Sequence, residues 1–170
     1  MFGNFFVNKI VFLCIMSDKI KKNIEIVNRK AEHEYFFNAK YEAGIMLGGT
    51  EVKAIRQGKA NLVDAFCVFS HGELFVRNLH ISEYSYGTHY NHETRRIRKL
   101  LLKKSELKKL ERKVSEKGMT IVPYRIFLNE RGFVKVEIVL AQGKKSYDKR
   151  ESLKEKDNKR TMDQLKKIKL

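Results

Sequence analysis

The chain has 170 residues, which suits one domain with extensions and is short for two. Its 36 lysines and arginines outnumber its 20 aspartates and glutamates, and the formal charge of +16 favours an anionic partner. No basic amphipathic helix with a broad apolar face is evident, so nucleic acid is favoured over a membrane, and the alternative is a protein that is merely basic.

The first 15 residues form an apolar run, MFGNFFVNKIVFLCI. The run lacks a basic leading region, no small-residue cleavage site follows it, and it is too short to cross a bilayer. We therefore expect no signal peptide and no membrane span, and our hypothesis is that Met16 is the true start. Residues 1–27 form an N-terminal extension and arm, because the stretch 18–30 is polar and basic, and this arm either is a solvated leader or contacts RNA.

Residues 33–49 alternate around aromatic side chains and predict a long strand that Gly44 could bend. Residues 50–58, TEVKAIRQG, predict a short helix that Thr50 caps and Gly58 closes, with Glu51 at its positive end. This helix presents three basic side chains to the outside, namely Lys53, Arg56 and Lys59.

Two apolar runs, 61–69 and 73–79, predict a hairpin joined by residues 70–72, Ser-His-Gly. The following stretch, 80–93, is rich in histidine, tyrosine and asparagine and predicts a loop. Its aromatic side chains either stack on splayed bases or face solvent.

Residues 94–117 predict the main helix, which Gly118 ends. Its apolar stripe comprises Leu100, Leu101, Leu107, Leu110 and Val114, and Ser105 is a candidate cap for a second helical segment. Residues 119–128 and 133–140 predict another hairpin, in which Pro123 indicates an edge or irregular position.

This order of elements predicts a mostly β fold with about three helices, and a small closed or partly closed barrel of the OB type over residues 28–142. A mixed open sheet is the alternative. The tail, residues 143–170, carries eleven lysines and arginines against five aspartates and glutamates. It has too few apolar residues to bury itself, so we expect it to be disordered when free and to fold against an anionic partner.

No catalytic or phosphate-binding motif is present, so the body is interpreted as a binding module without cofactor or metal. Cys14 and Cys67 match no metal or redox spacing, and a reducing cytoplasm is the simplest compartment. The five histidines also lack a metal-binding context. Glu42 and Glu51 could form an acid and base pair, but a structural or RNA-contacting carboxylate is favoured.

Three ordered segments carry a more specific likeness: NRKAEHEYFFNAKYEAGIMLGGTEVKAIRQGKANL, NHETRRIRKLLLKKSELKKL and GKKSYDKR. Together they resemble the SsrA-binding protein family, also called small protein B, from about Asn28 to the C-terminus. The chain departs from the family pattern at Thr94, where proline is frequent, and at Gln142, where lysine is usual.

The resemblance implies an OB-like barrel that binds the tRNA-like domain of transfer-messenger RNA and brings it to ribosomes stalled without a stop codon. The barrel would stand where the anticodon arm of a tRNA lies. The tail would fold as a helix in the empty mRNA channel and contact ribosomal RNA near the decoding centre. A cytoplasmic, monomeric, non-enzymatic protein is implied.

The resemblance also implies which residues bind. Those matching family residues that grip the RNA are Asn28, Glu42, Leu101 and Lys135, and basic positions in matching motifs add Arg29, Lys30, Lys53, Arg56, Lys59, Arg98, Lys99, Lys144 and Lys145. Ribosome-contacting tail positions are Tyr147, Asp148, Lys149, Arg150 and Leu165. The runner-up function is a generic basic OB-type protein that binds RNA or single strands, and an RNA-processing enzyme is a weaker third.

Overall fold

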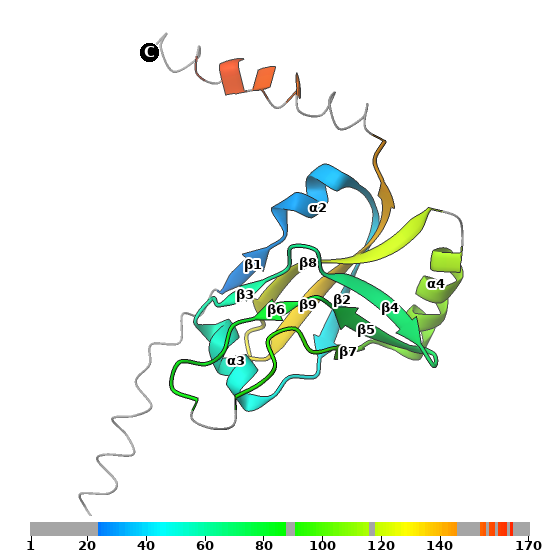
Figure 1. Ribbon diagram of the computed structural model, residues 1–170. Coiled ribbons are helices and arrows are strands. Elements are labelled where there is room, and N and C mark those ends of the chain that lie inside the picture. Colours follow the sequence, from blue (N-terminus) through cyan, green and yellow to red (C-terminus); the bar gives the residue numbers. More distant parts are fainter. Residues whose placement is uncertain are drawn as a thin grey trace, which may run out of the picture.

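The computed structural model describes residues 24–87, 91–115 and 118–145, together with residues 154, 155, 157, 158, 160–162 and 164 of the tail (Figure 1). The extension before residue 24, with the hypothesis about Met16, lies outside the described residues. The elements are β1 (Glu25–Val27), α2 (Arg29–Glu34), β2 (Tyr35–Ile45), α3 (Gly49–Arg56), β3 (Ala60–Asn61), β4 (Phe66–Ser70), β5 (Glu73–Arg77), β6 (His80–Ile81), β7 (Arg98–Leu101), α4 (Lys104–Ser115), β8 (Met119–Leu128) and β9 (Val134–Gly143).

Six antiparallel strands form a ring. Their order is β8, β4, β5, β7, β2 and β9, and the pairing of β9 with β8 closes it. The short strand β1 adds to the far part of β8, while β3 and β6 form a separate two-stranded sheet. The prediction of a mostly β, OB-like fold with about three helices is confirmed at this level, and the ring closure disfavours the open mixed sheet.

Strand alternation explains which side chains fill the ring. In β2, Lys40 and Glu42 are exposed, whereas Tyr41 and Ala43 pack on the core. The same period-two pattern turns one face inward in β5 and β7, whereas residues 136–141 of β9 are buried on both faces. The side chains of the ring strands that are buried in the core are Ala43, Cys67, Leu74, Val76, Leu100, Ile121, Ile126, Val136, Ile138 and Leu140.

Both hairpins form as expected. The turn between β4 and β5 consists of His71 and Gly72, whose φ angles of 52° and 74° suit a tight two-residue connection. The first strand of this hairpin is shorter than the run 61–69, because residues 60–61 pair with β6 instead. The pairing of β8 with β9 shifts register between Pro123 and Arg125, which confirms the irregular position predicted at the proline.

The prediction that residues 94–117 form the main helical stretch is wrong for its first part. Arg98–Leu101 form strand β7, which pairs with β5 on one side and β2 on the other, and among the described residues of this stretch only Lys104–Ser115 are helical. Leu100 points into the ring, whereas its neighbour Leu101 faces outward. The capping role proposed for Ser105 is also wrong, because Ser105 lies within α4 and the backbone N–H of Lys103 donates to Glu106.

The ends of other elements also differ from the prediction. The expected arm finishes in strand β1 and helix α2, so β2 begins at Tyr35 and not at residue 33. Helix α3 begins after Gly48, and Thr50 is not its cap. Gly58 closes the helix as predicted, with φ of 76° and a hydrogen bond from its N–H to the carbonyl of Ile55.

Two further differences from the prediction lie in the loop and at the start of the tail. Residues 80–81, expected in a loop, form β6. Strand β9 continues to Gly143, so the first tail residue that follows it is Lys144.

The alternation in β7 gives a direct test. Leu100 is 2% exposed and Leu101 is 49% exposed. We expect Leu100→Ala to lower the free energy of unfolding by about 2–5 kcal/mol, since it leaves a cavity in the ring. The neighbouring Leu101→Ala should cost less than about 1 kcal/mol. Urea denaturation measures both, and equal losses would contradict the strand assignment.

Candidate nucleic-acid interface

Three residues of the expected RNA site come together on the outside of the ring. Gly44 of β2 lies opposite Leu101 of β7 on one side and opposite Lys135 of β9 on the other. Glu42, two residues before Gly44, shares its face and is exposed. We call the outward side of β7, β2, β9, β8 and β1 the outer sheet face.

Gly44 has no side chain that would project from the middle of this face. A Cβ at this position would lie 3.3 Å from the Cβ of Leu101, which is tighter than ordinary contact. The glycine therefore leaves room for the Leu101 side chain, which stays half exposed and available to a partner.

An ion ladder crosses the outer sheet face from β1 to β2. Arg125 donates to Glu25 at 2.7 Å and to Glu137 at 2.7 Å, and Lys40 lies 3.3 Å from the other oxygen of Glu137. Hydrogen bonds to these two carboxylates raise the pKa of Arg125. The ladder thus links four strands through charged side chains of alternating sign.

The ladder continues to helix α2 through an aromatic ring. Lys40 Nζ lies 4.9 Å from the centre of the Tyr124 ring, a cation–π contact. The Tyr124 hydroxyl donates to Glu32 at 2.5 Å, and this bond raises the pKa of Tyr124 to about 12.

The ladder leaves Glu42 without a counter-charge. Glu42 lies directly opposite Glu137 in the pairing of β2 with β9, and like charges in this position disfavour each other. Glu137 has two cations, whereas the Glu42 side chain makes no hydrogen bond or ion pair with any residue that the structure describes. Glu42 is therefore an acceptor that a donor from outside can use.

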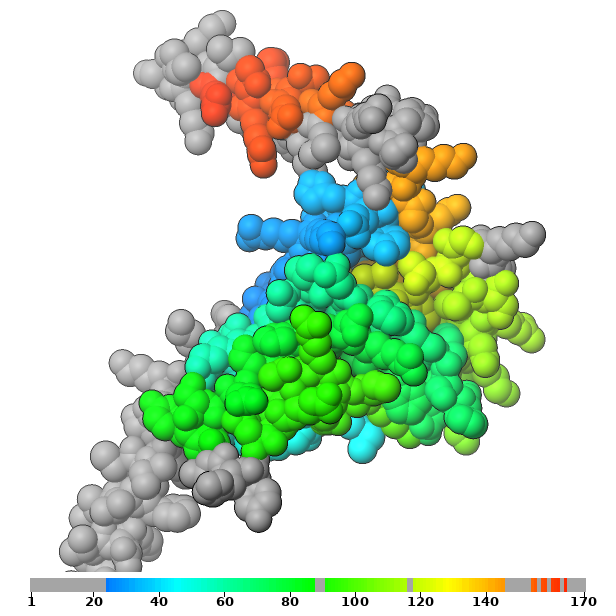
Figure 2. Space-filling view, in the orientation of Figure 1, coloured from blue at the N-terminus to red at the C-terminus, as the bar shows by residue number. Residues whose placement is uncertain are grey.

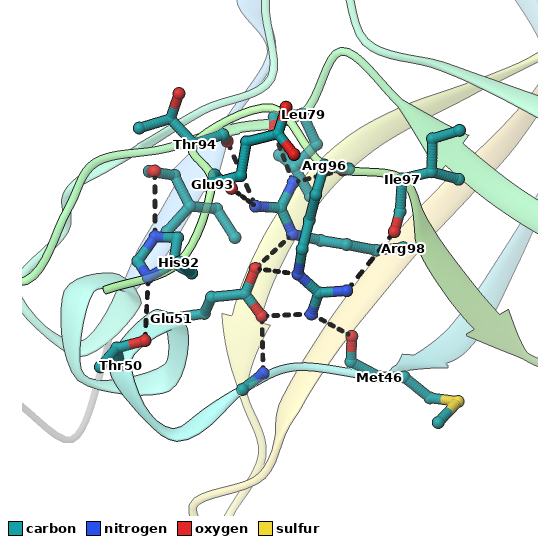
Figure 3. Close-up of polar contacts among 12 residues, drawn as sticks. Met46, Thr50, Glu51, Leu79, His92, Glu93, Thr94, Arg96, Ile97 and Arg98 are labelled. Atoms are coloured by element: carbon teal, nitrogen blue, oxygen red, sulfur yellow. Dashed lines mark hydrogen bonds and ion pairs between the residues drawn. The ribbon is translucent and has the colours of Figure 1, made fainter. Parts of the chain in front are cut away.

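Glu51 lies at the centre of a buried network (Figure 3). Its carboxylate accepts from the N–H of Gly48 at 2.6 Å, from Arg96 at 2.8 and 2.5 Å, and from Arg98 at 2.7 Å. Burial alone would raise the pKa of Glu51, but the bonds from Arg96, Gly48 and Arg98 lower it below its ordinary value. Glu51 is a structural carboxylate, and the acid and base reading of this residue is not supported.

Arg98 uses its other N–H groups on backbone carbonyls. It is 0% exposed and donates to the carbonyl oxygens of Leu79 (2.6 Å), Arg96 (3.0 Å), Thr94 (3.2 Å) and Glu93 (3.5 Å) (Figure 3). Burial lowers the pKa of Arg98 and the bond to Glu51 opposes this, whereas the pKa of Arg96 is raised by its bond to Glu51. Arg98 was expected to contact RNA, but its guanidinium group is engaged inside the protein.

The basic residues around α3 gather at one end of the ring, near the turn between β8 and β9. These residues are Lys53, Arg56 and Lys59, and all three are exposed. Lys53 Nζ lies 5.2 Å from the centre of the Tyr84 ring, Arg56 donates to the carbonyl of Gly132 at 3.4 Å, and Lys59 donates to Ser85 at 2.8 Å.

A second basic group lies at the other end, around α2 and the end of β9 (Figure 1). Arg29, Lys30 and Lys145 are exposed. Lys30 pairs with Asp64 at 2.9 Å, and Lys144 donates to the carbonyl of Glu32 at 3.0 Å. The expected binding residues thus fall into the outer sheet face and two separate basic ends.

Two further expected residues have partners within the protein, Asn28 and Lys99. Asn28 is 4% exposed, caps α2 by accepting from Ala31 N–H at 3.3 Å, and donates to the carbonyl of Leu62 at 3.0 Å. Lys99 lies on the outer side of β7 and pairs with Glu73. Asn28 therefore positions the start of α2, and its side chain is engaged inside the protein.

The expected ribosome-contacting residues Tyr147, Asp148, Lys149, Arg150 and Leu165 lie outside the described residues. The tail residues that the structure describes from residue 154 onward are helical and exposed, and Figure 1 shows them away from the ring. Arg160 lies 3.6 Å from Asp157 within this segment. The prediction that the tail folds only against a partner stays a prediction.

Sequence reasoning missed part of the outer sheet face. Lys40, Arg125 and Phe127 lie there, with Phe127 opposite Lys135 and Arg125 over the Phe127 ring at 5.0 Å. Lys40 could have been found, because it stands two residues before Glu42 on the same strand. Arg125 and Phe127 could not, because the register shift after Pro123 decides which way they face.

The described residues give little support for a metal site, a reactive cysteine or a membrane-spanning helix. Among the described residues no cluster of histidine, cysteine and acidic side chains could hold a metal ion. Cys67 is buried, and burial raises the pKa of its thiol, which makes it a poor nucleophile. No helix within the described part of the chain is long and apolar enough to cross a membrane.

The fold and the net charge of +16 define a class of small, strongly basic proteins with a ring of antiparallel strands. Comparison with known proteins narrows the class: the family model described as "SmpB protein" matches residues 25–168. The chain belongs to this family, the SsrA-binding proteins.

Several relatives named SsrA-binding protein match most of the chain. The protein from Christiangramia forsetii is 54% identical over 148 residues, covering 87% of this chain and 94% of the relative. The protein from Cytophaga hutchinsonii is 56% identical over 151 residues, covering 88% and 99%, and that from Phocaeicola vulgatus is 57% identical over 142 residues, covering 84% and 95%.

A solved structure is also similar. A chain from "tmRNA-SmpB: a journey to the center of the bacterial ribosome" has a TM-score of 0.63 and 49% sequence identity, covering 72% of this chain and 86% of that chain.

The buried network around Glu51 predicts a specific dependence of stability on pH. Glu51→Gln leaves Arg98 buried without a counter-charge, so we expect a loss of about 3–5 kcal/mol in the free energy of unfolding at neutral pH. Because the folded pKa of Glu51 is lowered, the stability it provides is present above its ordinary pKa of 4.5 and is lost as the pH falls through the folded pKa.

The difference between wild type and Glu51→Gln should therefore shrink below pH 4.5 in urea denaturation. Glu42→Gln is the matched control, since it makes the same change at an exposed carboxylate and should stay within about 0.5 kcal/mol of wild type. A variant at Glu51 as stable as this control would show that the network does not support the fold.

Proposed function

We propose that this chain is an RNA-binding factor of trans-translation. It binds the tRNA-like domain of SsrA RNA, the transfer-messenger RNA, and delivers this RNA to stalled ribosomes. Membership of the SsrA-binding protein family supports the proposal. The observation that carries it is the outer sheet face, where Glu42, Leu101 and Lys135 meet from three strands.

The three side chains offer different contacts to RNA. Lys135 suits a phosphate, and Leu101 suits the apolar face of a ribose or base. Glu42 repels phosphate, so its place at the centre of an RNA-binding face requires a specific donor such as a 2′-hydroxyl or a base N–H. The three contacts together recognise a specific RNA surface, whereas attraction between charges alone would not distinguish one RNA from another.

The two basic ends extend the interface. The residues around α3, Lys53, Arg56 and Lys59, hold the RNA backbone at one end. At the other end, Arg29, Lys30, Lys144 and Lys145 surround the place where the tail begins, and the tail contacts the ribosome through Tyr147, Asp148, Lys149, Arg150 and Leu165. In this arrangement the tail enters the empty mRNA channel and folds there as a helix.

The protein works by binding, as a monomer in the cytoplasm, and is not an enzyme. Aminoacylation and peptide transfer belong to other components of the system. A generic basic RNA-binding protein is the alternative, and it is less consistent with Glu42 at the centre of the face, since a binder that relies on charge gains nothing from an unpaired carboxylate there.

A charge reversal at Glu42 separates specific from bulk binding. Glu42→Arg makes the protein more basic, so bulk attraction would tighten binding. We expect instead that it weakens binding to tRNA-like RNA by about tenfold or more, because the acceptor is lost. Affinity is measured at moderate salt for this RNA and for an unstructured strand of equal length.

Glu111→Arg in α4 is the control, since Glu111 is exposed and the charge change is the same. It should not weaken binding. Wild-type protein should prefer the tRNA-like RNA, and equal affinity for both RNAs would favour the generic binder. Tighter binding by Glu42→Arg would contradict the role of this carboxylate.

The tail has a separate test. Truncation before Tyr147 should leave binding to the tRNA-like RNA nearly intact, because the outer sheet face and both basic ends remain. It should abolish the tagging of peptides on stalled ribosomes in a reconstituted translation reaction. Continued tagging by the truncated protein would contradict the role of the tail in the mRNA channel.

A further inference from the structure

A polar hollow lies away from the outer sheet face, at the small sheet of β3 and β6. It measures about 400 Å³ and is lined by Asn61, Val63, Asp64, Asn78, His80 and Arg95. We call it the β3–β6 hollow. The segments around β6 form part of the surface turned to the viewer in Figure 2.

Strand pairing brings the lining residues together from distant positions. Asn61 and His80 are direct partners in the pairing of β3 with β6, so their side chains stand side by side. The N–H of Ile81 donates to the carbonyl of Thr94 at 3.0 Å, which places Arg95 next to β6.

The buried guanidinium of Arg98 holds two sides of the hollow. It donates to the carbonyl of Leu79, which stands between Asn78 and His80, and to the carbonyl of Thr94, which precedes Arg95 (Figure 3). One rigid group with five donors therefore fixes both segments. The backbone that carries Asn78, His80 and Arg95 is therefore held in place.

The backbone adds a second sign of a shaped site. Asp64 and Asn78 have positive φ angles of 63° and 57°, and both line the hollow. Such conformations are uncommon for residues other than glycine, although asparagine and aspartate tolerate them best.

The hollow is rich in hydrogen-bond donors. The side chains of Asn78, His80 and Arg95 make no hydrogen bond or ion pair with any described residue, and Asn61 uses only its amide oxygen, which accepts from Val63 N–H at 2.8 Å. The one carboxylate, Asp64, is paired with Lys30 at 2.9 Å. Val63, 41% exposed, adds an apolar contact at the edge.

This chemistry fits one nucleotide. A guanidinium binds phosphate, the two amides and the imidazole can pair with the edge of a base, and an apolar side chain can contact a ribose or base. We propose that the β3–β6 hollow binds one unpaired nucleotide of RNA. The proposal rests on the proposed function, and the nucleotide belongs either to the transfer-messenger RNA or to ribosomal RNA.

Two substitutions test the hollow. Arg95→Gln removes the free cation, and Asn78→Gly removes the amide while keeping a residue that readily adopts positive φ. The control is Arg112→Gln in α4, an exposed arginine outside the hollow with the same loss of charge. Urea midpoints for the full-length variants verify that each is folded.

The two sources of the nucleotide give different results. If it belongs to the transfer-messenger RNA, Arg95→Gln should weaken binding to the tRNA-like RNA by about tenfold and Asn78→Gly by about fivefold, relative to Arg112→Gln. If it belongs to ribosomal RNA, this binding stays at the control level and tagging on stalled ribosomes falls instead.

Binding and tagging that both match the control would overturn the proposal. That outcome would leave the proposed function standing, because the preference of the wild-type protein for tRNA-like RNA is measured separately and depends on the outer sheet face.

Discussion

The fold depends on a carboxylate and a guanidinium that are both removed from water. Glu51 and Arg98 are 0% exposed, and moving two charges inside is unfavourable unless every donor and acceptor is used. Here they are used: Glu51 receives four hydrogen bonds, and Arg98 reaches four backbone carbonyls. The pair ties the start of α3 to β7 and to the connections on either side of β6, which a purely apolar contact could not orient so specifically.

The outer sheet face shows a different use of charge. A ladder of alternating signs satisfies Glu137 with two cations and leaves the opposite carboxylate, Glu42, with none. The sheet therefore presents the carboxylate of Glu42, without a counter-charge, beside Leu101 and Lys135. In a chain with 36 basic and 20 acidic residues, such a nearly balanced face contrasts with the basic ends of the ring.

Much of the fold could be predicted from local patterns. Alternation predicted β2, and turn residues predicted both hairpins, because these signals act between neighbours in sequence. Strand β7 could not be predicted this way, since Leu100 and Leu101 fit the same helical stripe as Leu107 and Leu110. What makes it a strand is pairing with β5 and β2, a non-local effect that overrides local spacing.

The candidate site was predicted unevenly for a similar reason. The resemblance selected Glu42, Leu101 and Lys135, which the sheet does bring together. Arg98 was added as a basic position in a matching motif, and nothing in its neighbourhood in the sequence marks it as buried, since arginine is seldom fully buried. The carboxylate that allows its burial stands 47 positions earlier in the chain, and only the folded ring reveals the partnership.

The contrast between the balanced face and the basic ends has a kinetic consequence. Long-range attraction comes from the basic side chains gathered at the two ends, so the rate at which RNA arrives should depend steeply on ionic strength. The outer sheet face acts at short range through a hydrogen-bond acceptor and an apolar side chain, which salt screens little. Capture and retention of the RNA are thereby assigned to different surfaces, and the lifetime of the complex can persist under conditions that slow its formation.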